Sequence, residues 1–198
     1  CLGRIDWWDK SILLTDIDFR TVSELEGKEP KSFPLFAAGS YAGPLREIVV
    51  QYKFHGATSV VPIVAERIAT QFGAEIQKLL PALLVPIPLH PSREYLRGYN
   101  QAEVLAKAVS PLVGIPVVDG IISRVKKRRP QSRLSKSKRA ANIKSVFALS
   151  ADLDSDLCHR VILVDDVVTS GQTLFEARRT LLAGGFEVVG AIAIAHRL

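Results

Sequence analysis

The segment from residue 161 to residue 174 constrains the fold more than any other part of the chain. Four apolar β-formers at 161–164 run into two adjacent carboxylates, Asp165 and Asp166, and a short hydroxyl-rich loop then leads into a helical pattern. A buried strand, a small loop and a helix form the repeating unit of parallel α/β sheets. Ligands of such sheets bind beyond the carboxyl ends of the strands. The sequence therefore predicts a ligand site directly after residue 164.

The two halves of this segment suit the two ends of a ribose phosphate. Carboxylates held by a buried strand can accept hydrogen bonds from vicinal hydroxyls. The loop supplies hydroxyl donors and a glycine, and the amides and positive dipole end of the next helix favour a phosphate. A solvated turn is the alternative interpretation. The residues predicted to bind a phosphorylated ribose are Asp165, Asp166, Val168, Thr169, Ser170, Gly171, Gln172 and Thr173.

Strand patterns alternate with helix patterns along the rest of the chain, which predicts an α/β fold with a mostly parallel twisted sheet flanked by helices. The polar stretch 24–32 predicts a boundary between an N-terminal segment, 1–32, and a domain, 33–198. We expect strands at 33–41, 83–88, 115–122, 146–149, 160–164 and 188–195. We expect helices at 44–52, at 58–80 with a break near Gly73, at 95–109 and at 171–183.

Positive charge is concentrated in one segment. Ten Lys and Arg residues fall between 124 and 144, and residues 121–150 contain no Asp or Glu, so the rest of the chain is net acidic. Such a segment predicts a polyanionic partner, either a diphosphate or a nucleic acid, although a solvated basic loop is the alternative. Lys127 and Arg128 are the predicted catalytic cations. The predicted nucleic-acid contacts are Lys126, Lys127, Arg128, Arg129 and Arg133.

The run 161–173 resembles the phosphoribosyl pyrophosphate signature of type I phosphoribosyltransferases. Further stretches resemble the competence protein F (ComF) family, a branch of that fold associated with DNA uptake and utilisation. They are Tyr-Lys-Phe-His-Gly at 52–56, Val-Pro-Ile-Pro-Leu-His at 85–90 with Arg93, Arg-Gly-Tyr-Asn-Gln at 97–101, and the stretch 124–142. Together these resemblances cover most of the chain from about residue 33 onward.

The resemblance implies a type I phosphoribosyltransferase that binds phosphoribosyl pyrophosphate with Mg²⁺, and that uses the basic segment to cover the reaction. It also implies that Leu89, His90, Arg93 and Arg97 hold the pyrophosphate. Alternatively, His90 caps the next helix and the arginines are solvated, while Asn100 and Gln101 either contact the acceptor or fix a helix start. The alternative function is a single-stranded-DNA-binding accessory protein with a vestigial or regulatory phosphoribosyl pyrophosphate site.

Compartment and metal content follow from simpler features. The longest apolar runs fall short of the roughly 20 residues of a membrane span, and no secretory pattern is present, so a cytoplasmic protein is expected. ComF members often carry paired N-terminal cysteines suggestive of zinc, whereas here only Cys1 remains. Because the chain starts at Cys1 and lacks methionine, we expect it to be incomplete. Zn²⁺ is expected only if cysteines precede Cys1, and residues 1–32 would then be a remnant of that metal-binding region.

Overall fold

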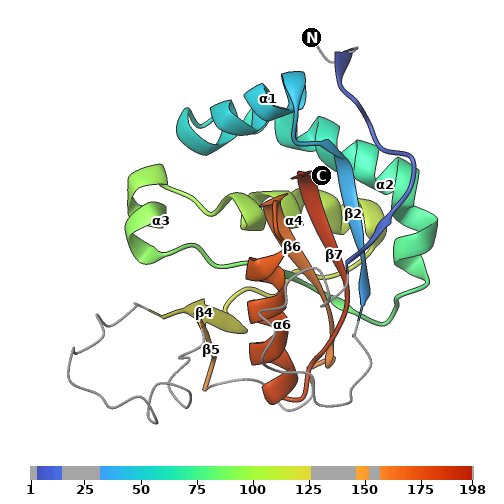
Figure 1. The fold of residues 1–198 in the computed structure, drawn as a ribbon. Helices are drawn as coiled ribbons and strands as arrows, with labels where there is room; N and C mark the ends of the chain where they lie inside the picture. The colour runs from blue at the N-terminus through green and yellow to red at the C-terminus, as the bar shows by residue number, and fades with distance from the viewer. Residues whose placement is uncertain (1–3, 15–31, 126–145, 152–156, 198) are drawn as a thin grey trace.

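The computed structural model describes residues 4–14, 32–125, 146–151 and 157–197. At its centre is a five-stranded sheet in the order β1-β2-β7-β6-β3 (Figure 1). The neighbours β2, β7, β6 and β3 pair in parallel, and β1 joins the edge antiparallel to β2. The predicted mostly parallel sheet is confirmed. Its strands are β1 (Ile12–Leu14), β2 (Phe33–Ser40), β3 (Leu83–Pro86), β6 (Arg160–Val168) and β7 (Glu187–His196).

Helices cover both faces of the sheet (Figure 1). On one face lie α1 (Gly43–Phe54), η3 (Thr58–Val60), α2 (Val61–Gln77) and α4 (Gln101–Val113). On the other lie α6 (Gln172–Ala183) and a hairpin of β4 (Ile122–Arg124) and β5 (Phe147–Leu149). The short α3 (Pro91–Arg97) projects beside them and buries none of its residues.

Two hydrophobic cores follow from this layering. In β6, Ile162 and Val164 pack into the core under α1, α2 and α4, whereas Val161 and Leu163 pack into the core under α6. The alternation arises because successive side chains of a strand point to opposite faces. All four residues are fully buried since both faces of the sheet are covered.

Three details of the predicted secondary structure are wrong. The helix expected to break near Gly73 is continuous there. The helix expected at 95–109 is two helices, because Gly98 ends α3 with a φ of 77° and the Asn100 side chain caps α4. The strand expected at 115–122 is reduced to a bridge between Val117 and Leu84, and β4 begins at Ile122. Local capping thus overrides the apolar pattern between 91 and 101.

The N-terminal residues lie along the end of β2 and are held there by α2. The Trp8 amide donates to the Ala38 carbonyl at 3.0 Å, and Arg67 donates to the Trp8 carbonyl at 3.1 Å. Because β1 also joins the central sheet, the described part of 1–32 packs directly on the domain. The division at residue 32 stays a prediction. Cys1, on which the zinc expectation depends, lies outside the described residues.

Two glycines with different surroundings give a test of this packing. A Cβ on Gly39 would overlap the carbonyl oxygen of Asp6, whereas a Cβ on Gly73, inside α2, would meet nothing within 4 Å. We expect Gly39→Ala to lower the free energy of unfolding by about 1–3 kcal/mol through overpacking. Gly73→Ala should raise it by about 0.5–1 kcal/mol, since alanine favours a helix interior. Urea denaturation measures both, and changes of the same sign would contradict this packing.

No helix within the described ranges combines the length and the apolar character of a membrane-spanning segment.

Candidate functional site

The carboxyl ends of β3, β6 and β7 lie together at one edge of the sheet. Pro86 of β3 pairs with Val164 of β6, and Val168 pairs with His196 of β7. Beyond Pro86, the Ile87 amide still donates to the Val164 carbonyl at 2.8 Å. The loop that follows β3 therefore begins beside the acidic residues of β6, as the topology of a parallel sheet requires.

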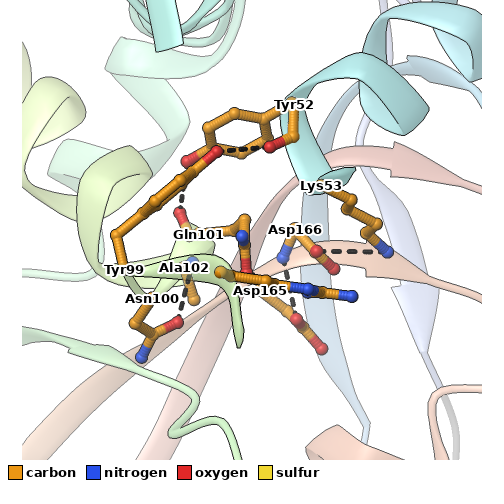
Figure 2. Close-up of polar contacts among 9 residues, drawn as sticks. Tyr52, Lys53, Tyr99, Asn100, Gln101, Ala102, Asp165 and Asp166 are labelled. Carbon is orange, nitrogen blue, oxygen red and sulfur yellow. Dashed lines mark hydrogen bonds and ion pairs between the residues drawn. The ribbon is translucent and has the colours of Figure 1, made fainter. Parts of the chain in front are cut away.

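Asp165 and Asp166 lie within β6 rather than after it, because the strand runs to Val168 and not to residue 164 as predicted. Asp165 Oδ1 accepts a hydrogen bond from the Asp166 amide at 2.8 Å, and Asp166 Oδ2 lies 3.1 Å from Lys53 Nζ (Figure 2). Burial, and next the neighbouring Asp166, raise the pKa of Asp165. The pair is thus a partly desolvated acceptor site near the carboxyl end of β6.

The turn after β6 presents donors next to these acids. Thr169 and Ser170 are exposed, and Gly171 begins α6 with a φ of 69°, a conformation that favours glycine. No side chain caps α6. The first amides of a helix lack intrahelical partners, so they and the helix dipole favour an anion here. Gln172 and Thr173 supply the first of these amides.

The loop after β3 has a clear structural role. His90 is the N-cap of α3, since its Nδ1 accepts from the Ser92 amide at 3.3 Å. Arg93 is exposed, whereas Arg97 donates to Gln101 Oε1 at 2.9 Å and lies over the Phe54 ring at 5.2 Å. The assignment of Leu89, His90, Arg93 and Arg97 to pyrophosphate stays a prediction.

A hydrogen-bond network joins α1, α4 and the loop after β3 (Figure 2). The Tyr52 hydroxyl donates to the Gln101 carbonyl at 2.7 Å, and the Tyr99 hydroxyl donates to the Tyr52 carbonyl. Asn100 donates from Nδ2 to the Ile87 carbonyl at 3.1 Å, and its Oδ1 accepts from the Ala102 amide. Asn100 therefore fixes the start of α4, the second of its two expected roles.

His196 was missed by sequence reasoning. It ends β7 beside the turn at 169–171, where burial lowers its pKa and the nearby Thr169 backbone opposes that shift. Its ring also packs edge-on against Trp8 at 5.6 Å. A lone histidine in an apolar run carries no sequence signal. Its pairing with Val168 shows its place only once the strand order is known.

The predicted cations Lys126, Lys127, Arg128, Arg129 and Arg133 lie outside the described residues. The described residues that flank them meet, because the Val125 amide donates to the Val146 carbonyl at 3.0 Å next to the β4–β5 pairing. Arg124 at this hairpin is within electrostatic range of Asp165: burial, and next Arg93, lower the pKa of Arg124, while Asp165 opposes them. The basic segment therefore leaves and re-enters the fold near the acidic pair.

The comparisons with known proteins agree with this geometry. A family model described as a phosphoribosyl transferase domain matches residues 100–198. Competence protein F of Haemophilus influenzae is 32% identical over 172 residues, which make up 85% of this chain and 75% of that protein. The chain belongs to the competence protein F family. The DNA utilization protein YhgH of Salmonella typhimurium is 31% identical over 167 residues, or 82% of this chain and 71% of that protein.

Among solved structures, a hypoxanthine phosphoribosyltransferase from Trypanosoma cruzi is similar over 70% of this chain, with a TM-score of 0.38 and 15% identity. This chain spans 65% of that chain, which is less than two thirds of its length. The strand order and the domain match together confirm the predicted α/β type I phosphoribosyltransferase fold of this ComF-family chain.

Proposed function

We propose that this ComF-family chain binds phosphoribosyl pyrophosphate at the carboxyl end of β6 and transfers its phosphoribosyl group. One observation carries the proposal: Asp165 and Asp166 lie in the carboxyl-terminal part of β6, and the turn after this strand leads into an uncapped helix N-terminus at Gly171. A ribose with a 5-phosphate needs acceptors for its two hydroxyls and donors for its phosphate. The strand supplies the first and the turn into α6 supplies the second.

Each predicted residue has a part in this binding. The Asp165 and Asp166 carboxylates accept hydrogen bonds from the ribose hydroxyls, and the backbone of 168–173 surrounds the phosphate. Thr169, Ser170 and Thr173 add hydroxyl donors. The loop with Leu89 and His90 and the arginines of α3 face the leaving diphosphate, because β3 lies next to β6. Charge-assisted hydrogen bonds to phosphate oxygens are about twice as strong as neutral ones.

Mg²⁺ fits this site as a companion of the diphosphate. Within the described ranges, no three or more His, Cys, Asp or Glu side chains form a group that could hold a metal ion. Mg²⁺ commonly keeps several waters and binds through substrate phosphates rather than in an all-protein cage. It would therefore enter on the diphosphate oxygens. When bound there, it neutralises the charge that develops on the leaving group.

The proposed reaction displaces pyrophosphate from C1 of the ribose. A bond forms between C1 and a nitrogen nucleophile while the bond from C1 to the diphosphate oxygen breaks, and the electron pair leaves with pyrophosphate. Lys127 and Arg128 stabilise that charge more strongly in the transition state than in the ground state. Arg124, the described cation closest to them in sequence, already lies within electrostatic range of Asp165.

Isothermal titration of the chain with phosphoribosyl pyrophosphate and Mg²⁺ tests the proposal. We expect saturable one-site binding, and weaker binding of ribose 5-phosphate because it lacks the diphosphate. Release of pyrophosphate in the presence of candidate nitrogen acceptors would establish turnover. Absence of binding by the wild-type chain would contradict the proposed function.

The biological setting that we propose is DNA uptake or utilisation in the cytoplasm. Its support is the similarity to a protein named for competence and to one named for DNA utilization. The cytoplasmic location rests on the sequence expectation described above.

A second candidate function is single-stranded DNA binding, with the phosphoribosyl pyrophosphate site regulatory or vestigial. One observation favours it: Tyr95 and Leu96 of α3 are 90% and 81% exposed, beside the exposed Arg93. Exposed aromatic rings among cations are typical of surfaces on which successive bases stack. In this candidate function, a single DNA strand contacts both this surface and the basic segment.

Salt dependence of binding tests this second candidate. Affinity for a fluorescent oligothymidine should fall with salt, and a variant with glutamine at Lys126, Lys127, Arg128 and Arg129 should flatten that slope by about 0.7 per lost phosphate contact. Tyr95→Ala should weaken binding by about 1–3 kcal/mol, whereas Tyr95→Phe keeps the ring and should not. Fluorescence anisotropy measures both. An unchanged slope would argue against DNA binding by the basic segment.

A further inference from the structure

An ion pair with little solvent exposure joins α1 to the acidic strand. Lys53 Nζ lies 3.1 Å from Asp166 Oδ2, and the two side chains are only 20% and 12% exposed. Lysine rarely gives up solvent unless its ammonium has a partner. Figure 2 shows Lys53 reaching from α1 to the end of β6, so its charge lies at the proposed ribose site.

The backbone on which Lys53 stands is fixed. Its neighbour Tyr52 is fully buried, donates its hydroxyl to the Gln101 carbonyl and accepts a hydrogen bond at its own carbonyl from Tyr99. These contacts tie the last turn of α1 to the start of α4 (Figure 2). The packing of the neighbouring Tyr52 thus fixes the backbone from which the Lys53 side chain extends to Asp166.

The acidic pair needs a nearby cation. Two adjacent carboxylates in a partly desolvated site favour the protonation of one of them, and burial with Asp166 raises the pKa of Asp165. Three groups face the pair from the elements packed against it. Lys53 of α1 contacts Asp166, Tyr52 of α1 stays neutral because burial raises its pKa, and Arg124 of β4 approaches Asp165. Lys53 is the described cation in direct contact.

We propose that Lys53 is a positioning residue of the ribose site: its ammonium holds the Asp166 carboxylate in the orientation in which the acidic pair accepts both ribose hydroxyls. The inference rests on the proposed function and assigns a role that acts through Asp166. A protonated carboxyl offers a weaker acceptor to a hydroxyl than a carboxylate does. Without Lys53, the pKa of Asp165 rises further and a larger share of its carboxyl is protonated at neutral pH. We therefore expect weaker binding of the ribose.

The sign of the pH effect distinguishes this role from direct contact with the ligand. Burial and Asp166 raise the pKa of Asp165 and Lys53 opposes them, so removal of Lys53 raises that pKa further and the ionised form of Asp165 returns only as the pH rises. We expect Lys53→Met to weaken binding of phosphoribosyl pyrophosphate about 10-fold or more at about pH 7, equivalent to one pKa unit or more. At about pH 9 most of that loss should disappear. Lys53→Arg, which keeps the charge, should stay close to wild type.

Calorimetric titration with phosphoribosyl pyrophosphate and Mg²⁺ at both pH values measures these constants, and thermal unfolding shows whether each variant folds. Lys78→Met is the matched control, because Lys78 also stands at the carboxyl end of a helix, as the C-cap of α2, but is exposed. Wild-type affinity of Lys53→Met at both pH values would overturn the inference. An equal loss at both pH values would also overturn it, since Lys53 would then contact the ligand itself. Failure of the wild-type chain to bind would instead refute the proposed function.

Discussion

The variant Asp165→Ala, Asp166→Ala should lose at least about 100-fold in affinity for phosphoribosyl pyrophosphate. In the proposed complex each carboxylate accepts a charge-assisted hydrogen bond from a ribose hydroxyl, and such bonds are worth about 1.5–3 kcal/mol apiece. Two of them correspond to the expected loss at about 1.4 kcal/mol per factor of ten. The alanines of the double variant offer no side-chain acceptor at these two positions of β6. Isothermal titration with Mg²⁺ present measures the change.

A control separates this loss from a general effect of charge. Asp119 is an exposed carboxylate in the loop before β4, so Asp119→Ala removes a negative charge without touching the site. It should bind like wild type. Thermal unfolding should show that the double variant stays folded. Equal affinity of the double variant and the wild type would refute the assignment of Asp165 and Asp166.

The second large effect is expected at the turn into α6. Gly171 has a φ of 69° directly before the first helical amides, so Gly171→Ala forces alanine into the left-handed region and adds a Cβ beside the phosphate. We expect at least a 10-fold loss in affinity for phosphoribosyl pyrophosphate. Binding of ribose 5-phosphate should fall by a similar factor, because the same phosphate is affected. Titration of both ligands measures this.

Gly114 provides the matched control. It follows the last turn of α4 with a φ of 65°, and a Cβ there meets nothing within 4 Å. Gly114→Ala therefore carries the same backbone strain, about 1 kcal/mol. It does so at the C-terminal end of α4, the end opposite to the one that Asn100 caps. It should lower stability without changing affinity. If both variants lose affinity equally, the effect comes from stability and not from the phosphate cradle.

The sequence predicted the central unit of the fold because that unit is local. Four apolar residues, the acids Asp165 and Asp166 and the helix after Gly171 follow one another in the chain, so their order alone indicates strand, turn and helix. The resemblance to the ComF family came from further short segments, at 52–56, 85–93, 97–101 and 124–142, and is confirmed. The extension of β6 to Val168 was not visible, since the strand continues through two adjacent aspartates, a residue type that is depleted in strands.

Contacts between distant segments could not be predicted. The hydrogen bond from Tyr52 to Gln101 joins residues 49 positions apart, and the one from Tyr99 to Tyr52 joins residues 47 apart. Each depends on how α1 packs on the sheet. The pairing of Lys53 with Asp166 depends on the same packing, so the sequence alone does not indicate it. His196 became visible only through the register of β7 against β6.

The two acids of β6 serve opposite sides of the sheet, since Asp166 meets Lys53 of α1 and Asp165 approaches Arg124 of the hairpin. Successive residues of a strand point to opposite faces of the sheet. Adding or deleting a single residue between Arg160 and Asp165 would therefore exchange the surroundings of the two acids while preserving both side chains. Engineers who graft this motif onto another scaffold must therefore conserve the parity of the strand as strictly as the identity of its acids.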